Sequence, residues 1–186
     1  MDRELREKLD EYGVTIVEKG EWQSWHHYII PIFMWVVGFF NPSFKSWFYN
    51  SAVNVFGSTI YMPDLERFEE NPGSFERVIR HELVHIMDWK ERPVWFPISY
   101  VISRKMRAFW EYRGYTQNII HRYETAGYVS NAYLRTIARN FEGSNYFWMD
   151  RDPMPVLNAI REKVEDEEIT GFDNETLNET IRKNRT

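Results

Sequence analysis

The sequence lacks cysteine altogether. This absence excludes a disulfide framework and a metal site built from thiolates, so a bound metal would depend on histidine and carboxylate side chains. Long apolar runs are also missing. The charge-free stretch from Tyr28 to Phe40 is interrupted by Pro31 and Gly38, and it is shorter than the roughly 20 residues that a membrane-spanning helix needs.

An excess of basic residues is absent as well. The formal net charge is −5, and the lysines and arginines are scattered along the chain, which argues against nucleic-acid binding. The first eight residues are mostly charged and no apolar core follows them, so the N-terminus does not look like a classical signal peptide. We expect a protein that is not secreted by that route and that acts in the cytoplasm or in a larger assembly.

One motif dominates what the sequence does contain. His81-Glu82-Leu83-Val84-His85 is an HExxH pattern inside a segment, Ser74–Trp89, whose apolar residues recur at the helical period. Residues four apart lie on the same face of a helix, so both imidazoles can reach one metal ion while Glu82 lies beside it. The pattern predicts half of a zinc hydrolase site. The simpler alternative is an amphipathic helix with two solvated or core histidines.

The surroundings of the motif favour a helix. Ile79, Leu83 and Ile86 would face a core. Ser74 is a candidate N-cap after the turn residues that precede it, and the helix must end before Pro93. Both histidines are therefore expected in the middle of the helix.

A catalytic zinc ion usually has three protein ligands and leaves the fourth position for water. The next segment that is expected to form a long helix is Arg104–Tyr123, and it carries Glu111, the candidate for the third ligand. Glu124 and His121 are competitors. An ordinary surface ion pair with the residue one turn earlier would also explain Glu111.

Several neighbours could support such a site. Arg107 and Tyr115 lie one turn before and one turn after Glu111, so Arg107 could orient its carboxylate. Tyr115 could donate a hydrogen bond to the substrate oxyanion, a role for which His121 and Tyr146 also compete. Asp88, one turn after the second histidine, could bind the free N–H of that imidazole, and a solvated Asp88 is the alternative.

The motif and the second segment together resemble the gluzincin group of zinc metallopeptidases. In this sequence the HExxH motif is followed by Arg-Ala-x-x-Glu-x-x-Gly-Tyr, residues 107–115, and Gly114 occupies the place of a small residue that lets the two helices approach closely. The resemblance covers residues 53–128. It implies that His81, His85 and Glu111 bind Zn²⁺ and that Glu82 is the general base of peptide hydrolysis.

The resemblance also extends to a strand. Val53–Tyr61 is β-branched and aromatic, with a bulge or close backbone approach expected at Gly57. In zincins the strand nearest the metal can pair with an extended peptide, and strand addition at a sheet edge is a recurrent way to bind peptides. The expected partner is therefore a peptide or protein substrate, and a core strand is the alternative.

Aromatic residues make up 17% of the chain and are concentrated in residues 22–49. A buried core segment is the simplest interpretation. Alternatively, this segment is an exposed patch that binds a partner protein. Contact with a membrane interface is the third interpretation, and the scarcity of basic residues near the segment argues against it.

These observations predict a mostly helical α+β, zincin-like domain over residues 1–160, with a metal core at about 53–128 and a short sheet beside the HExxH helix. Residues 161–186 are expected to form a charged helix or a disordered tail. The predicted function is zinc-dependent peptide hydrolysis. The alternatives are a zincin-like structural or adaptor component of a larger assembly, and a hydrolase of peptidoglycan amides.

Overall fold

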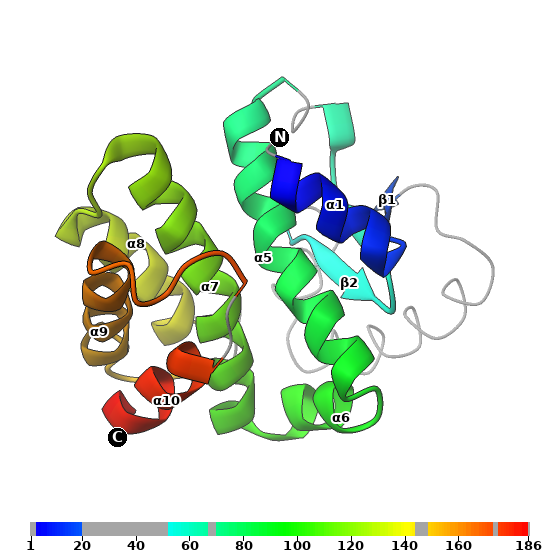
Figure 1. The fold of residues 1–186 in the computed structure, drawn as a ribbon. Helices are drawn as coiled ribbons and strands as arrows, with labels where there is room; N and C mark the ends of the chain where they lie inside the picture. Colours follow the sequence, from blue (N-terminus) through cyan, green and yellow to red (C-terminus); the bar gives the residue numbers. More distant parts are fainter. Residues whose placement is uncertain (1–2, 20–51, 67–69, 144–148, 173–174, 186) are drawn as a thin grey trace. The chain divides into compact units, whose positions relative to one another are not determined.

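The computed structural model describes residues 3–19, 52–66, 70–143, 149–172 and 175–185. The chain is mostly helical and contains a small three-stranded sheet, which agrees with the predicted α+β class (Figure 1). It forms two compact units, residues 1–76 and 77–186. The aromatic segment 22–49 and Tyr146 lie outside the described residues, so the predictions made for them stay predictions.

The described part of the first unit includes a helix and the sheet. Helix α1 spans Arg3–Tyr12, and strands β1, β2 and β3 span Thr15–Glu18, Asn54–Phe56 and Thr59–Met62. The strand order is β1-β3-β2, with β1 parallel and β2 antiparallel to β3. Because β3 is paired on both sides, a peptide strand could not be added to this sheet next to β3.

The single strand expected over residues 53–61 is wrong. Phe56 pairs with Thr59 across a two-residue turn, so the segment is a hairpin of β2 and β3. Gly57 has a φ of 60°, a conformation that favours glycine and that starts tight hairpin turns. The glycine that suggested a bulge is therefore the residue that reverses the chain.

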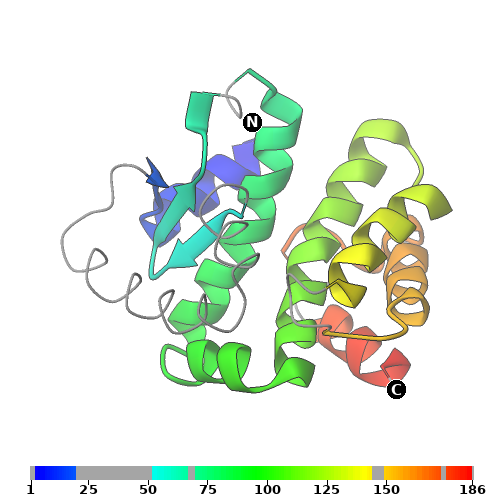
Figure 2. The same ribbon diagram turned by 180° about the vertical axis from the view of Figure 1, so that it is seen from behind.

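Six helices are described from residue 72 onward. They are α5 (Pro72–Glu91), α6 (Trp95–Ile102), α7 (Arg104–Ala126), α8 (Asn131–Glu142), α9 (Met154–Glu165) and α10 (Glu175–Asn184). Figures 1 and 2 show α8, α9 and α10 gathered on one side of α7. Their apolar side chains form one core with α7, to which the C-terminal helix contributes Leu177 and Ile181.

Helix α5 begins two residues earlier than the sequence suggests. Pro72 occupies the first helical position, where its missing N–H is not needed, and the side chain of Asn71 accepts a hydrogen bond from the Ser74 N–H at 3.3 Å. Asn71, and not Ser74, therefore caps the helix. The end at Glu91 agrees with the limit set by Pro93. None of the helices described here combines the length and the apolar character that crossing a membrane requires.

Candidate metal centre

The two histidines of the HExxH motif lie in the middle of α5, well away from either end. His81 and His85 are one turn apart on the same face, and their Nε2 atoms are 3.3 Å from each other. Both side chains are buried, with exposed fractions of 8% and 6%. The helix and the shared face are those that the four-residue spacing predicts.

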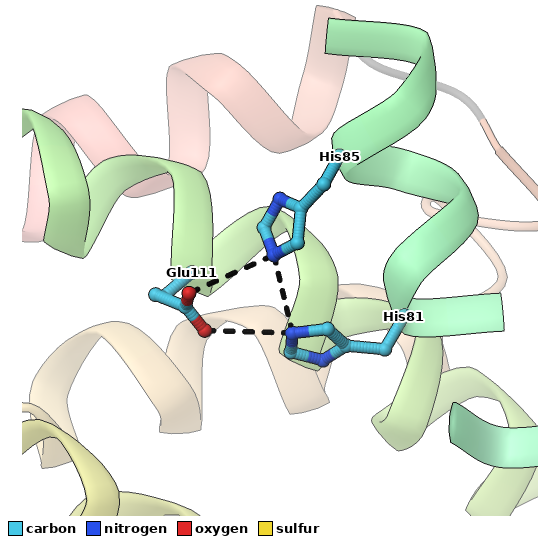
Figure 3. Close-up of side chains that lie close together, drawn as sticks. All are labelled: His81, His85 and Glu111. Atoms are coloured by element: carbon cyan, nitrogen blue, oxygen red, sulfur yellow. Dashed lines mark hydrogen bonds and ion pairs between the residues drawn. The ribbon is translucent and has the colours of Figure 1, made fainter. Parts of the chain in front are cut away.

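Glu111 reaches the same point from α7. The Ser103 side chain caps the start of this helix by accepting a hydrogen bond from the Met106 N–H at 3.2 Å. The Glu111 Oε2 atom lies 3.4 Å from His81 Nε2, and Oε1 lies 3.7 Å from His85 Nε2. Figure 3 shows the three side chains pointing toward one another from α5 and α7.

The distances within this group suit a metal ion. All three ligand atoms lie within 4.8 Å of one another. A tetrahedral zinc ion with bonds of ~2.0–2.2 Å holds its ligand atoms about 3.4 Å apart. The separation of 3.3 Å between the two Nε2 atoms matches that value, and the two imidazoles lie 3.4 and 3.7 Å from the two different oxygens of the Glu111 carboxylate. In addition, Glu111 Oε2 is buried without a hydrogen-bond partner. The group could therefore hold a metal ion with three protein ligands.

Close approach of α7 to His81 depends on Gly114. A Cβ atom at this position would lie 2.7 Å from both Cε1 and Nε2 of His81 and 2.9 Å from Cδ2. These separations are about 0.8 Å shorter than an ordinary carbon contact of ~3.5 Å. The role of a small residue at Gly114, expected from the resemblance, agrees with this packing.

The surroundings of the group favour an ionised Glu111 and a neutral His85, whereas His81 holds a proton more readily than usual. Burial raises the pKa of Glu111, but its close contact with His81, the charges of both histidines and the hydrogen bond from Tyr100 together lower the pKa to about 2. Burial lowers the pKa of His85 to about 4, so its imidazole is neutral at pH 7, as a metal ligand must be. Burial also lowers the pKa of His81, but Glu111 and Glu82 outweigh it and the pKa is raised.

Tyr100 is a site residue that sequence reasoning missed. It lies on α6, and its hydroxyl donates a hydrogen bond to Glu111 Oε1. Its ring centroid is 6.2 Å from that of His85, and the Phe96 ring lies 6.0 Å from His85 on the same side. The Pro93 and Pro97 positions obscured α6 in the sequence. Pro97 is tolerated because it lies in the first turn, where the N–H has no intrahelical acceptor.

Arg107 supports the site through α6. Its Nη1 atom donates to the Tyr100 carbonyl at 2.8 Å and to the Val101 carbonyl at 3.2 Å. These are carbonyls of the last turn of α6, which has no following turn to bind them. Arg107 therefore fixes the end of the helix that carries Tyr100, in addition to the charge it places near Glu111.

The two predicted catalytic residues lie beside the metal-binding group. Glu82 is half-buried, and its charge acts on the pKa values of both His81 and Tyr100. The Tyr115 ring stands edge-on to the His81 ring with centroids 4.7 Å apart. The Tyr115 hydroxyl accepts a hydrogen bond from Asn140 Nδ2 at 2.8 Å.

Other residues that the sequence offered have different partners. Glu124 forms an ion pair with Arg80 at 3.1 Å, and neither it nor His121 belongs to the metal-binding group. For Asp88 the sequence left two alternatives, a hydrogen bond with the free N–H of His85 and a solvated side chain. Instead it forms a buried ion pair with Arg113 at 2.9 Å, while His85 Nδ1 is buried without a hydrogen-bond partner. Asp88 points across to α7 because that helix supplies a guanidinium, which satisfies a buried carboxylate better than a neutral imidazole.

Comparison of the chain with protein family models, with curated proteins and with solved structures finds no match. The likeness to gluzincins therefore depends on the motif, on the position of Glu111 and on the packing at Gly114.

Proposed function

We propose that this protein is a zinc-dependent hydrolase of peptide bonds. The observation that carries the proposal is the buried group of His81, His85 and Glu111, with Glu82 half-buried beside it on α5. Two imidazoles, one carboxylate and a neighbouring glutamate are the residues that HExxH metallopeptidases use. Zinc is favoured over magnesium or calcium because those ions prefer ligand sets made of oxygen.

The roles of the residues follow from their positions. When bound, zinc supplies a water nucleophile at neutral pH and polarises the scissile carbonyl. Glu82 accepts the proton of the attacking water and delivers it to the leaving amine. Tyr115, next to His81, donates a hydrogen bond to the oxyanion that develops on the substrate. Tyr100 is a positioning residue, since its hydroxyl binds the Glu111 carboxylate and fixes its orientation.

One observation favours a second candidate function. All three ligand side chains are almost fully buried. A catalytic zinc site needs an open fourth position, whereas a structural site is closed. A structural metal centre in an adaptor component is therefore the competing proposal, and the two differ in whether Glu82 is needed for any activity.

Metal analysis and a hydrolysis assay on the same samples separate the two proposals. We expect near-stoichiometric zinc in the wild type and in Glu82→Gln, and loss of zinc in Glu111→Ala. Peptide mixtures and peptidoglycan fragments are then incubated with each protein, and the products are detected by mass spectrometry. Removal of a general base should lower turnover by about 10²–10⁴-fold, so Glu82→Gln should show almost no products.

Glu91→Gln is the matched control, since Glu91 lies on the same helix and is exposed. It should keep both zinc and activity. Zinc in the wild type with no products from either substrate class would favour the structural centre. Zinc retained in Glu111→Ala would show that the third ligand is a different residue.

A further inference from the structure

Exposed apolar residues are concentrated on α6. Among the residues that the structure describes, six large apolar side chains are exposed, and five of them belong to this helix or to the residue before it. The five are Val94, Trp95, Ile98, Val101 and Ile102. Their spacing of three or four residues places them along one face, and we call this set the α6 face. The opposite side of the helix buries Phe96 and Ser99 in the protein.

Basic residues border the α6 face. Between Glu91 and Glu111 the sequence contains four basic residues and no acidic one, although the whole chain has a net charge of −5. Arg104 and Lys105, the first two residues of α7, are separated from α6 by Ser103 alone and are exposed. Arg92 precedes the helix and pairs with Glu91 at 3.3 Å, an exposed ion pair that contributes little and can exchange for another anion.

A hollow adjoins this border. It has a volume of about 360 Å³ and is lined by four basic residues over an apolar floor. The lining consists of Arg92, Lys105, Arg182 and Arg185 with Met106 and Phe109. Arg92 and Lys105 line the hollow and also flank α6 in the sequence, so the hollow adds cations close to the two ends of this helix. A ligand that carries an anionic group joined to an apolar chain would match these basic and apolar side chains.

We propose that the α6 face and its basic border bind the surface of an anionic phospholipid bilayer. Apolar side chains of α6 enter the boundary between headgroups and acyl chains, and the basic residues contact headgroup phosphates. A tryptophan at the start of the helix suits the same boundary, where its ring is apolar and its N–H remains hydrated. This binding does not depend on the proposed hydrolase function.

The choice of a bilayer over a protein partner follows from the charge pattern. An apolar patch alone fits either partner. A bilayer of anionic lipids presents many phosphates over a wide area, which matches cations at both ends of α6 and in the hollow. The buried side of α6 carries Tyr100, which binds Glu111. Binding through the α6 face would thus bring the metal centre to within about one helix diameter, ~10 Å, of the membrane surface.

Co-sedimentation of the full chain with vesicles tests the proposal. The vesicles contain phosphatidylcholine alone or phosphatidylcholine with phosphatidylglycerol. We expect binding to the anionic vesicles, weaker binding as the salt concentration rises, and little binding to the neutral ones. Each basic residue near an anionic leaflet contributes about fivefold to binding, so Arg104→Glu with Lys105→Glu should weaken it at least ~25-fold. Ile98→Ser with Ile102→Ser should weaken it roughly tenfold or more.

Matched controls show whether the effects are local. Tyr128→Ser removes an exposed aromatic ring that lies outside α6, with an exposed fraction of 56% against 53% for Trp95. Arg135→Glu with Arg139→Glu reverses two exposed charges on α8. Both controls should bind the vesicles as the wild type does, and thermal unfolding should be unchanged in every variant because all these side chains are exposed.

Several results would overturn the proposal. These are the absence of binding to anionic vesicles, equal binding to neutral vesicles, or equal losses in the α6 variants and their controls. Dimers in size-exclusion chromatography that the variant of Ile98 and Ile102 abolishes, without vesicle binding, would instead assign the α6 face to self-association.

Discussion

Replacement of Gly114 by alanine is the sharpest test of how the two helices form the metal centre. The added methyl group would lie 2.7 Å from two atoms of the His81 ring. To restore an ordinary contact, the ring or α7 must move by about 0.8 Å. Ligand distances in a metal site tolerate deviations of only ~0.2 Å. We therefore expect Gly114→Ala to lower zinc affinity by one to two orders of magnitude, since His81 can no longer align with the other ligands.

The effect on stability without metal is the difference of two terms. Alanine in the middle of a helix is favoured over glycine by about 1 kcal/mol. Overpacking of a buried site costs about 1–3 kcal/mol. The net change in the free energy of unfolding of the metal-free protein should therefore be a destabilisation of at most ~2 kcal/mol, which leaves the fold intact for the binding measurement.

Two comparisons separate the effect of the contact with His81 from the effect of the higher helix propensity of alanine. Gly73 lies in α5, and a Cβ atom there would meet no atom within 4 Å, so Gly73→Ala should leave zinc affinity unchanged. In a His81→Ala background the ring is gone, and Gly114→Ala should then raise the free energy of unfolding by up to about 1 kcal/mol. The effect of Gly114→Ala on the free energy of unfolding thus changes from destabilising to stabilising when the His81 ring is removed.

Zinc affinity can be measured by competition with a chelator of known affinity, and stability by thermal unfolding with and without zinc. Gly114→Ala that binds zinc as tightly as the wild type would refute the reasoning, because the His81 ring could then not lie against α7 in the metal-bound protein.

Two further predictions concern the neighbours of the ligands. Tyr100→Phe removes the hydrogen bond to Glu111 and should lower zinc affinity about 10–100-fold, measured by the same chelator competition, with little loss of stability. Tyr133→Phe removes a tyrosine hydroxyl away from the site and should leave zinc affinity unchanged. Removal of one partner of the buried pair of Asp88 and Arg113 should destabilise the protein by about 3–5 kcal/mol. Replacement of both by leucine should recover much of this loss in urea unfolding, and strictly additive losses would show that the two residues are not coupled.

The parts of the site that the sequence could predict are those that depend on one helix. The spacing of His81 and His85 fixes their shared face without knowledge of any other element. The prediction of Glu111 as a ligand required more information, because the position of its side chain depends on how α7 packs against α5. The small residue at Gly114 was the signal for this close packing. Fold class was predictable on the same basis, since the helical periods of α5 and α7 extend over many turns.

The errors have local causes. Gly57 fits either a bulge within a strand or a turn between two strands, and the strand pattern on each side was too short to distinguish them. Tyr100 lies in a segment with two prolines, and its hydrogen bond to Glu111 joins two helices across the Ser103 turn. For Asp88 the sequence offered His85 or solvent as alternatives, and its partner Arg113 is on another helix. Contacts between helices decide all these roles except that of Gly57, and a single sequence does not show them.

The partners of two buried carboxylates distinguish the group that could hold a metal ion from its neighbour. Each helix carries a buried carboxylate, Asp88 on α5 and Glu111 on α7. Arg113 forms a buried ion pair with Asp88 at 2.9 Å, whereas within the described residues the ion pairs of Glu111 involve only the two histidines. His85 is neutral at pH 7 because burial lowers its pKa to about 4. The Glu111 carboxylate is ionised, since its pKa is lowered to about 2, and its ion-pair partners are imidazoles, which can bind a metal ion when they are neutral. Glu111 therefore has neighbours that can bind a metal ion with it, whereas the partner of Asp88 is a guanidinium, which cannot.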